Sequence, residues 1–246
     1  MNDPFNTDAL TTDTFFNGRI RINQQRCGYR FSIDPVILAH HVYPRSHDAV
    51  LDLGTGCGVI PLILAFRNPH IKLFGVEIQP DLAKIAQANI DANRFQDRIS
   101  IYCMDMKILG CDVIAKPVDI IVSNPPYRKT DAGRINPNTQ RAVARHEIQI
   151  TLEDVIDCAR RMLRTGGKFS TIYTAERLTA IIYLMRSAGI EPKYYRMIHS
   201  GWNSAAKLVL LEGVKGGRPG SRIAPPLIVY NEAGTYTPEI EKMFQV

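Results

Sequence analysis

The amino-acid sequence predicts an α/β fold: a central sheet of about seven mostly parallel strands, with one antiparallel strand and helices on both faces. Three observations support this prediction. Short apolar runs of strand length alternate with amphipathic segments of helix length along most of the chain. A glycine-rich segment at residues 52–58 follows one such run and opens a helix, as at the carboxyl edge of a parallel sheet. The last two strands have only a short connection, which requires antiparallel pairing.

The N-terminal part of the chain is polar and mixed. Within it, residues 18–22 alternate between apolar and polar side chains, which predicts a β-hairpin in the first 30 residues. Residues 31–42 then predict a helix, with Asp34 as a possible N-cap and Pro35 at the first helical position.

The middle of the chain alternates between strands and helices. We predict strands at residues 49–53, 72–76, 99–103, 119–122 and 168–173, and helices at residues 59–67, 81–93, 152–163 and 177–188. Residues 128–148 are rich in Arg, Asn and Thr and are predicted as a loop. This alternation implies parallel strands joined by right-handed crossovers.

Capping residues mark the ends of these helices. Thr151 predicts an N-cap, and Asp154 three positions later completes a variant of the capping box. Gly166 and Gly167 are expected to end that helix, and Gly189 closes the following one. The helix at 81–93 starts beside Pro80 and places four apolar side chains on one face: Leu82, Ile85, Ala86 and Ile90.

The C-terminal part contains the antiparallel pair and a basic tail. Strands are predicted at 193–199 and 207–212, and their connection holds Trp202, which is either a core side chain or part of a substrate-binding face. The tail is rich in Gly and Pro and predicts a mobile loop before a short ending. We therefore divide the chain into an N-terminal extension, a main domain and a C-terminal extension: residues 1–30, 31–213 and 214–246.

Bulk composition narrows the functional classes. No uninterrupted apolar run is long enough to span a membrane, and the N-terminus lacks the features of a signal peptide, so we expect a cytosolic protein, with a monomer favoured. The five cysteines have no C-x-x-C spacing, so neither a disulfide framework nor a metal site is predicted, and we expect mostly buried, reduced thiols. The net charge of +6 and the pI near 9.1 permit a nucleic-acid partner without proving one.

The glycine-rich segment, Asp52-Leu-Gly-Thr-Gly-Cys-Gly58, predicts a ligand-binding loop. Its G-x-G-x-G spacing differs from the G-x-G-x-x-G that pyrophosphate cofactors favour, and a carboxylate has no use beside phosphates. Asp52 instead suits a cationic ligand with an ammonium or a sulfonium group. S-adenosylmethionine carries both.

Acidic residues follow the next two strands as well. Glu77 ends the second strand, where a carboxylate accepts hydrogen bonds from ribose hydroxyls, and Asp105 follows the third, where it could accept from an adenine amino group. The predicted cofactor-binding residues are Asp52, Gly54, Thr55, Gly56, Gly58, Glu77, Ile78, Asp105, Met106 and Asn124.

The fourth strand runs into Asn124-Pro125-Pro126-Tyr127, which we predict to be catalytic. An exocyclic amino group is a poor nucleophile because its lone pair is delocalised into the ring. The Asn124 amide oxygen and the Pro125 carbonyl could accept from its two hydrogens and concentrate electron density on nitrogen. The prolines stiffen the loop, and Tyr127 could stack on a flat substrate.

Together, these motifs resemble the class I methyltransferases that act on amino nitrogens. The resemblance covers about residues 30–213 and rests on DLGTGCG, Glu77, Asp105 and NPPY. Within that group, FFNGRIRINQQRCGYRFSIDPVILAHH and RAVARHE are most similar to the bacterial tRNA adenine-N6 methyltransferases that modify valine tRNA beside the anticodon. The resemblance implies a Rossmann-like fold and S-adenosylmethionine as cofactor. It also implies that the segment around residues 31–34 closes over that cofactor.

An RNA substrate, most simply tRNA, would need positive charge near the catalytic motif. The predicted RNA-binding residues lie in the loop after the motif: Arg128, Lys129, Arg134, Arg141 and Arg145.

Four alternatives remain open. A protein-glutamine methyltransferase would use the same motif, but such enzymes usually carry a helical domain before the glycine loop, where only about 50 residues stand here. An rRNA guanine-N2 methyltransferase often has a duplicated or extended domain. A non-catalytic RNA-binding module would not need Asp52, Asn124 and Tyr127 intact. An NAD-dependent dehydrogenase is disfavoured by the loop spacing and by the NPPY motif.

Overall fold

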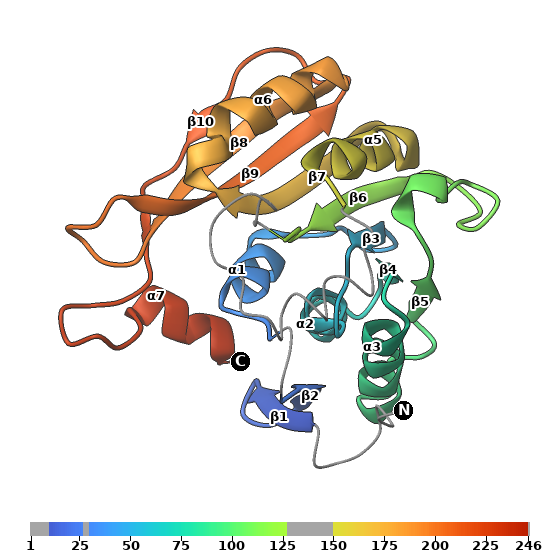
Figure 1. The fold of residues 1–246 in the computed structure, drawn as a ribbon, viewed down its shortest axis with the longest axis horizontal. Helices are drawn as coiled ribbons and strands as arrows, with labels where there is room; N and C mark the ends of the chain where they lie inside the picture. The colour runs from blue at the N-terminus through green and yellow to red at the C-terminus, as the bar shows by residue number, and fades with distance from the viewer. Residues whose placement is uncertain (1–9, 27–29, 127–149, 246) are drawn as a thin grey trace, which may run out of the picture.

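The computed structural model describes residues 10–26, 30–126 and 150–245 (Figure 1). Its strands are β1 (Leu10–Phe15), β2 (Ile20–Gln25), β3 (Ala49–Leu53), β4 (Lys72–Glu77), β5 (Ile99–Cys103), β6 (Val118–Ser123), β7 (Leu163–Thr174), β8 (Ile190–His199), β9 (Ala206–Lys215), β10 (Arg222–Ile223) and β11 (Leu227–Ile228). Its helices are α1 (Asp34–His41), α2 (Val59–Arg67), α3 (Pro80–Ala92), α5 (Leu152–Met162), α6 (Leu178–Ser187) and α7 (Pro238–Glu241). Short 3-10 turns are η2 (Met106–Ile108), η3 (Ala175–Arg177) and η4 (Lys242–Phe244).

The strands after β2 form one nine-stranded sheet. Its order is β10-β8-β9-β7-β6-β3-β4-β5, and β11 also pairs with β8. Strand β9 runs antiparallel to both of its neighbours, and the other pairings are parallel. This confirms the mostly parallel sheet with one antiparallel strand near the C-terminus. The chain order reverses between β3 and β6, which places a binding crevice at the carboxyl ends of these strands.

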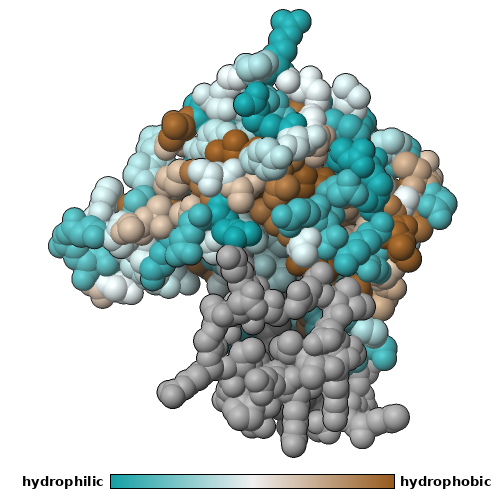
Figure 2. Space-filling model, turned by 45° about the horizontal axis from the view of Figure 1, so that its top comes forward, coloured by the Kyte–Doolittle hydropathy of each residue, from teal (hydrophilic) through white to brown (hydrophobic). Residues whose placement is uncertain are grey.

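Helices cover both faces of the sheet, as the alternating pattern predicts. In Figure 1, α5 and α6 lie above the sheet and α1, α2 and α3 lie below it. Each layer buries its own apolar cluster: Leu62 and Leu64 of α2 belong to one, and Val155 and Ala159 of α5 belong to the other. The outer surface in Figure 2 mixes hydrophilic side chains with smaller hydrophobic areas. Among the described residues, none of the helices has the length and apolarity that a membrane crossing requires.

Local signals place several boundaries correctly. Strands β3 and β5 and helix α2 have the predicted bounds. The capping box of α5 is present: Asp154 N–H donates to Thr151 Oγ1 at 3.2 Å, and Thr151 N–H donates to Asp154 Oδ2 at 2.9 Å. The predicted N-cap of α1 is wrong, because Ile33 holds that position and Asp34 is already helical, with Pro35 in the first turn.

The prediction that Gly166 and Gly167 end a helix is also wrong. Helix α5 ends at Met162 and the chain enters β7 directly. The pairing with β6 passes from Val118–Leu163 to Ile120–Lys168, so the two glycines lie in an irregularity of the strand. Gly166 has a φ of 76°, which a β-carbon would strain.

The cysteine prediction holds in part. Cys57 and Cys158 are free and buried, whereas Cys103 and Cys111 are free and exposed. Among the residues that the structure describes, no cluster of three His, Cys, Asp or Glu side chains could hold a metal ion.

The N-terminal strands form the predicted hairpin, in which Leu10 pairs with Gln25 and Phe15 with Ile20. Helix α3 binds its edge through side-chain amides. Asn89 Oδ1 accepts from Asn23 N–H at 2.8 Å, and Asn89 Nδ2 donates to Asn23 O at 2.8 Å. These bonds satisfy strand-edge groups that would otherwise be unpaired.

The C-terminal tail is ordered rather than a loop, which corrects the prediction. Its strands β10 and β11 add to β8 at the sheet edge, and Leu227, Val229 and Ile240 are buried. The tail also reaches the hairpin, since Phe16 N–H donates to Phe244 O at 3.0 Å.

A line of five aromatic rings, here called the aromatic row, runs from this tail to the segment before α1. Ring centroids are 5.4 Å apart for Tyr230 and Tyr236, and 5.7 Å apart for Tyr236 and Phe244. They are 5.5 Å apart for Phe244 and Phe15, and 5.9 Å apart for Phe15 and Phe31. The row therefore ties the C-terminal tail, the hairpin and the segment before α1 into one packed unit.

Candidate functional site

The glycine-rich loop lies where β3 meets α2. Gly54, Gly56 and Gly58 all have positive φ, at 76°, 58° and 85°. The N–H groups of Gly54 and Thr55 donate to Val76 O at 2.9 and 3.0 Å, which holds the loop over the end of β4. A β-carbon added at Gly54 would meet no atom within 4 Å, so this side of the loop faces open space that a ligand can fill.

Glu77 holds the glycine-rich loop through a side-chain hydrogen bond. Its side chain is buried, and its Oε2 accepts from Gly56 N–H at 2.9 Å. Its Oε1 accepts from Gln79 N–H at 3.0 Å. Gln79 Nε2 adds a longer bond of 3.5 Å to the same oxygen. A carboxylate has about four acceptor sites, so Glu77 retains capacity for a ligand hydroxyl after these bonds.

Asp52 lies in β3 just before the loop and is 1% exposed. Neither carboxylate oxygen has a hydrogen-bond partner among the described residues, and the buried Thr55 hydroxyl has none either. Burial raises the pKa of Asp52 to about 7. The polar Thr55 hydroxyl nearby offsets part of this rise without forming a hydrogen bond of normal geometry, and the charge of Glu77 adds to it. Buried polar groups without partners are rare in native proteins and need an explanation. A ligand that brings cationic or hydrogen-donating groups would satisfy Asp52.

Asp105 follows β5 and already has a structural role. Its Oδ1 accepts from Lys107 N–H at 2.9 Å and caps the 3-10 turn η2. The side chain is half-buried, Met106 beside it is buried, and Ile78 is half-buried after β4.

The end of β6 is tied to both neighbouring strands. Ser123 Oγ donates to Leu53 O at 2.8 Å, and Thr171 Oγ1 donates to Ser123 O at 2.8 Å. Asn124 follows at once and is half-buried, with Pro125 buried and Pro126 exposed. These two hydrogen bonds fix the position of Ser123, and so the point at which Asn124 begins the segment after β6. Tyr127 lies outside the described residues, as do the predicted RNA-binding residues Arg128, Lys129, Arg134, Arg141 and Arg145.

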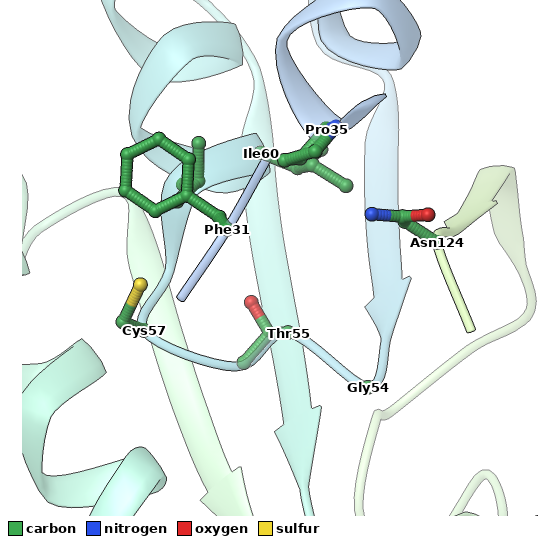
Figure 3. Close-up of a pocket in the computed structure, with 8 residues that line it drawn as sticks. Phe31, Pro35, Gly54, Thr55, Cys57, Ile60 and Asn124 are labelled. Atoms are coloured by element: carbon green, nitrogen blue, oxygen red, sulfur yellow. The ribbon is translucent and has the colours of Figure 1, made fainter. Parts of the chain in front are cut away.

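A cleft brings the loop and Asn124 together (Figure 3). In this view the Thr55 hydroxyl and Gly54 lie between Phe31 and Cys57 at one end and Asn124 at the other. The residues lining the cleft are Phe31, Pro35, Gly54, Thr55, Cys57, Val59, Ile60 and Asn124. The sequence analysis does not predict four of these residues, because no chemistry distinguishes them from core residues: Pro35, Cys57, Val59 and Ile60.

These features define the class. A mostly parallel sheet with one antiparallel strand, helices on both faces and a glycine-rich loop at its reversal point is the fold of the class I methyltransferases. A predicted O-methyltransferase from Agrobacterium tumefaciens has a similar fold, with a TM-score of 0.68 at 21% identity, covering 85% of this chain and 94% of that one. TYW2 of Pyrococcus horikoshii, solved in complex with MeSAdo, has a TM-score of 0.60 at 19% identity, covering 87% and 74%.

The chain belongs to the methyltransferase small domain family, whose model matches residues 31–182. Among its relatives is a tRNA1(Val) (adenine(37)-N6)-methyltransferase of Porphyromonas gingivalis, 30% identical over 95% of this chain and 94% of the relative. A protein of the same name from Tolumonas auensis is 27% identical over 90% of each chain.

Proposed function

We propose that this protein transfers a methyl group from S-adenosylmethionine to N6 of an adenine in tRNA, at position 37 of valine tRNA as in the names of its relatives. The observation that carries the proposal is the cleft shared by the glycine loop and Asn124. The loop is suited to the cofactor and Asn124 to the amino group that receives the methyl.

The cofactor would be held by groups that the fold leaves available. Asp52 and Thr55 offer buried oxygens without partners, and Glu77 offers its remaining acceptor sites. The open side of Gly54 lets backbone approach the ligand closely. When bound, S-adenosylmethionine supplies an electrophilic methyl carbon whose bonding electrons return to sulfur.

Asn124 and Pro125 would prepare the acceptor. The Asn124 side-chain oxygen and the Pro125 carbonyl each accept a hydrogen bond from the adenine amino group. These bonds counter the delocalisation of the nitrogen lone pair, so that nitrogen can form the new bond to carbon. The surplus proton on nitrogen then leaves through these same oxygens to solvent. Positioning and charge arrangement supply the rate enhancement.

A tRNA substrate also suggests roles for other parts of the chain. We infer that residues 31–213 form the catalytic part, and that Arg128, Lys129, Arg134, Arg141 and Arg145 contact RNA phosphates beside Tyr127, which stacks on the base. A tRNA substrate agrees with a cytosolic protein, and a monomer suffices for the proposed site.

The test is methyl transfer from labelled S-adenosylmethionine to total bacterial tRNA, followed by nucleoside analysis. We expect N6-methyladenosine with the wild-type protein. With Asn124→Ala we expect transfer to be slower by a factor of about 100 or more, since one transition-state contact is lost. Cofactor affinity, measured by calorimetry, should stay nearly unchanged in that variant. Cofactor binding without any transfer to tRNA would move the substrate to rRNA or to a protein glutamine. Unchanged transfer by Asn124→Ala would refute its role.

A further inference from the structure

The connection between β8 and β9 presents the single tryptophan of the chain to solvent. Trp202 is 68% exposed. The turn around it is fixed: Ser204 N–H donates to Gly201 O at 3.1 Å, and Gly201 N–H donates to Ser204 Oγ at 3.0 Å. His199 Nδ1 adds a contact of 2.7 Å to Ser204 O. A large apolar ring is thus held in water by a hydrogen-bonded turn, so of the two alternatives for Trp202 the one that makes it a core side chain is wrong.

A second exposed aromatic residue lies on the adjoining backbone. Tyr230 N–H donates to Ser200 O at 2.9 Å, and Tyr230 is 40% exposed. In Figure 1 the β8–β9 connection and the segment between β11 and α7 both project from the left side of the molecule. We call Trp202 and Tyr230 the aromatic platform.

The platform lies at the edge of the sheet that carries the cleft. Strand β8 runs in the same direction as β6. Strand β6 is parallel to β7, whereas β9 is antiparallel to both β7 and β8, so the direction reverses twice between β6 and β8. Asn124 follows the end of β6, and the turn with Trp202 follows the end of β8. Three inter-strand steps separate the two strands, which is about 14 Å across the sheet. The end of β6 is level with Tyr195, so β8 runs four residues further to His199 and the two ends lie about 20 Å apart.

The aromatic row gives a second, independent link to the cleft. It begins at Tyr230 of the platform and ends at Phe31, which lines the cleft. The exposed ring of Tyr230 is therefore backed by packed rings along the whole path. Such backing lowers the entropy lost when a ligand stacks on it.

We propose that Trp202 and Tyr230 form a stacking surface for unpaired RNA bases that flank the target adenine; this rests on the proposed function. An adenine that enters the cleft leaves its neighbours unstacked, and exposed aromatic rings replace the lost stacking. The charges near the platform balance: residues 200–211 contain no carboxylate and include the exposed Lys207, while the adjoining turn carries the exposed Glu232.

The single tryptophan makes the proposal directly measurable. Trp202 emission should fall when the protein is titrated with a synthetic anticodon stem–loop of valine tRNA, because a stacked base quenches indole. The same hairpin with abasic nucleotides beside the target adenine should leave the emission nearly unchanged. Emission that responds equally to both hairpins, or to neither, would overturn the proposal. Emission that changes with protein concentration alone would mean that the platform binds a second copy of the chain, and would also overturn it.

Variants provide the second measurement, with labelled hairpin in an anisotropy titration. Trp202→Ala should weaken hairpin binding about tenfold, equal to about 1.4 kcal/mol, whereas Trp202→Phe retains a ring and should recover part of the loss. Tyr183→Ala is the matched control, since Tyr183 is 70% exposed on α6, on the other face of the sheet from α1. Equal affinities for Trp202→Ala and the wild type would refute the platform.

The outcome can be separated from that of the proposed function. Methyl transfer to tRNA by the wild type is measured independently of Trp202. Transfer with normal hairpin binding by Trp202→Ala would leave the proposed function standing and remove the platform. Quenching by the hairpin without methyl transfer would leave the platform standing and remove the proposed reaction.

Discussion

At the scale of single residues, Asp52 combines burial with a carboxylate that lacks partners. Removal of water from an unpaired carboxylate disfavours its ionised form, which is why its pKa rises to about 7. A residue that served stability alone would be neutral or paired. The free energy that the buried Asp52 carboxylate costs the ligand-free protein is explained if a bound ligand supplies the missing partner.

This cost predicts how stability depends on pH. The pKa of Asp52 in the folded protein lies above its ordinary value of 3.8, so its stabilising protonation is complete below about pH 4 and is lost as pH rises through 7. Asp52→Asn should therefore stabilise the protein at pH 8 by up to about 4 kcal/mol, and by clearly less at pH 5. Urea unfolding at both pH values measures this.

One control variant and one binding measurement accompany the Asp52 prediction. Asp97→Asn changes an exposed carboxylate and should show no comparable difference between the two pH values. Asp52→Asn should also weaken S-adenosylmethionine binding at least tenfold, because a hydrogen bond to a charged group is lost. A stability gain of the same size at pH 5 and pH 8 would contradict the shifted pKa.

Residue chemistry also explains what sequence could and could not predict about the cleft. Asp52, Glu77 and Asn124 stand at or near the ends of three strands, and Asp52 and Asn124 lead into the glycine-rich loop and the NPPY motif, so their types and spacing indicate a site. Pro35 and Ile60 line the same cleft through shape alone, and nothing in their sequence context distinguishes them from core residues. Side chains that contribute only through their shape can be identified only in the folded structure.

At the scale of elements, local signals succeed where the local bond decides the structure. The capping box of α5 satisfies the N–H groups of Asp154 and Thr151 within four residues, and it is visible in the sequence. Gly166 and Gly167 misled the prediction because a glycine pair can end a helix or permit a strand irregularity. The pairing of β7 with β6, more than 40 residues away, decides between them.

The capping box gives an element-scale prediction. Thr151→Ala should destabilise the protein by about 1 kcal/mol, because the Asp154 N–H loses its side-chain acceptor. For a chain of this size the melting temperature should fall by about 2 to 4 °C. Thr179→Ala, an exposed residue in the first turn of α6 that is not its cap, should change it much less. Equal shifts in the two variants would remove the capping contribution.

At the scale of the whole molecule, the order of strands and layers follows from alternation and crossover rules, which act along the entire chain. The tail does not follow from them. Its glycines and prolines predict a loop, yet Leu227 and Val229 become buried because the edge of β8 is available beside them. That packing depends on a partner far away in sequence, so no local pattern could predict it.

The aromatic row supplies the whole-molecule prediction. Phe244→Ala removes the ring between Phe15 and Tyr236, which should lower stability by about 2 kcal/mol and loosen the hairpin. Hydrogen exchange of the amides in residues 10–25 should accelerate in this variant. Tyr183→Ala is again the exposed-aromatic control. Unaltered hairpin exchange in Phe244→Ala would show that Phe16 N–H and the α3 amides hold the hairpin without the row.

The contact between Phe15 and Phe244 also bears on how the protein is made. The two rings are 229 positions apart (244 − 15). At a translation rate of about 5–20 residues per second, the hairpin emerges roughly 10 to 50 seconds before its partner is synthesised. During that interval the apolar side of the nascent hairpin has no C-terminal cover, so chaperones have their longest opportunity at this end of the chain. Phe31 then gains its full aromatic support only late in biosynthesis, after every strand of the parallel sheet has been translated.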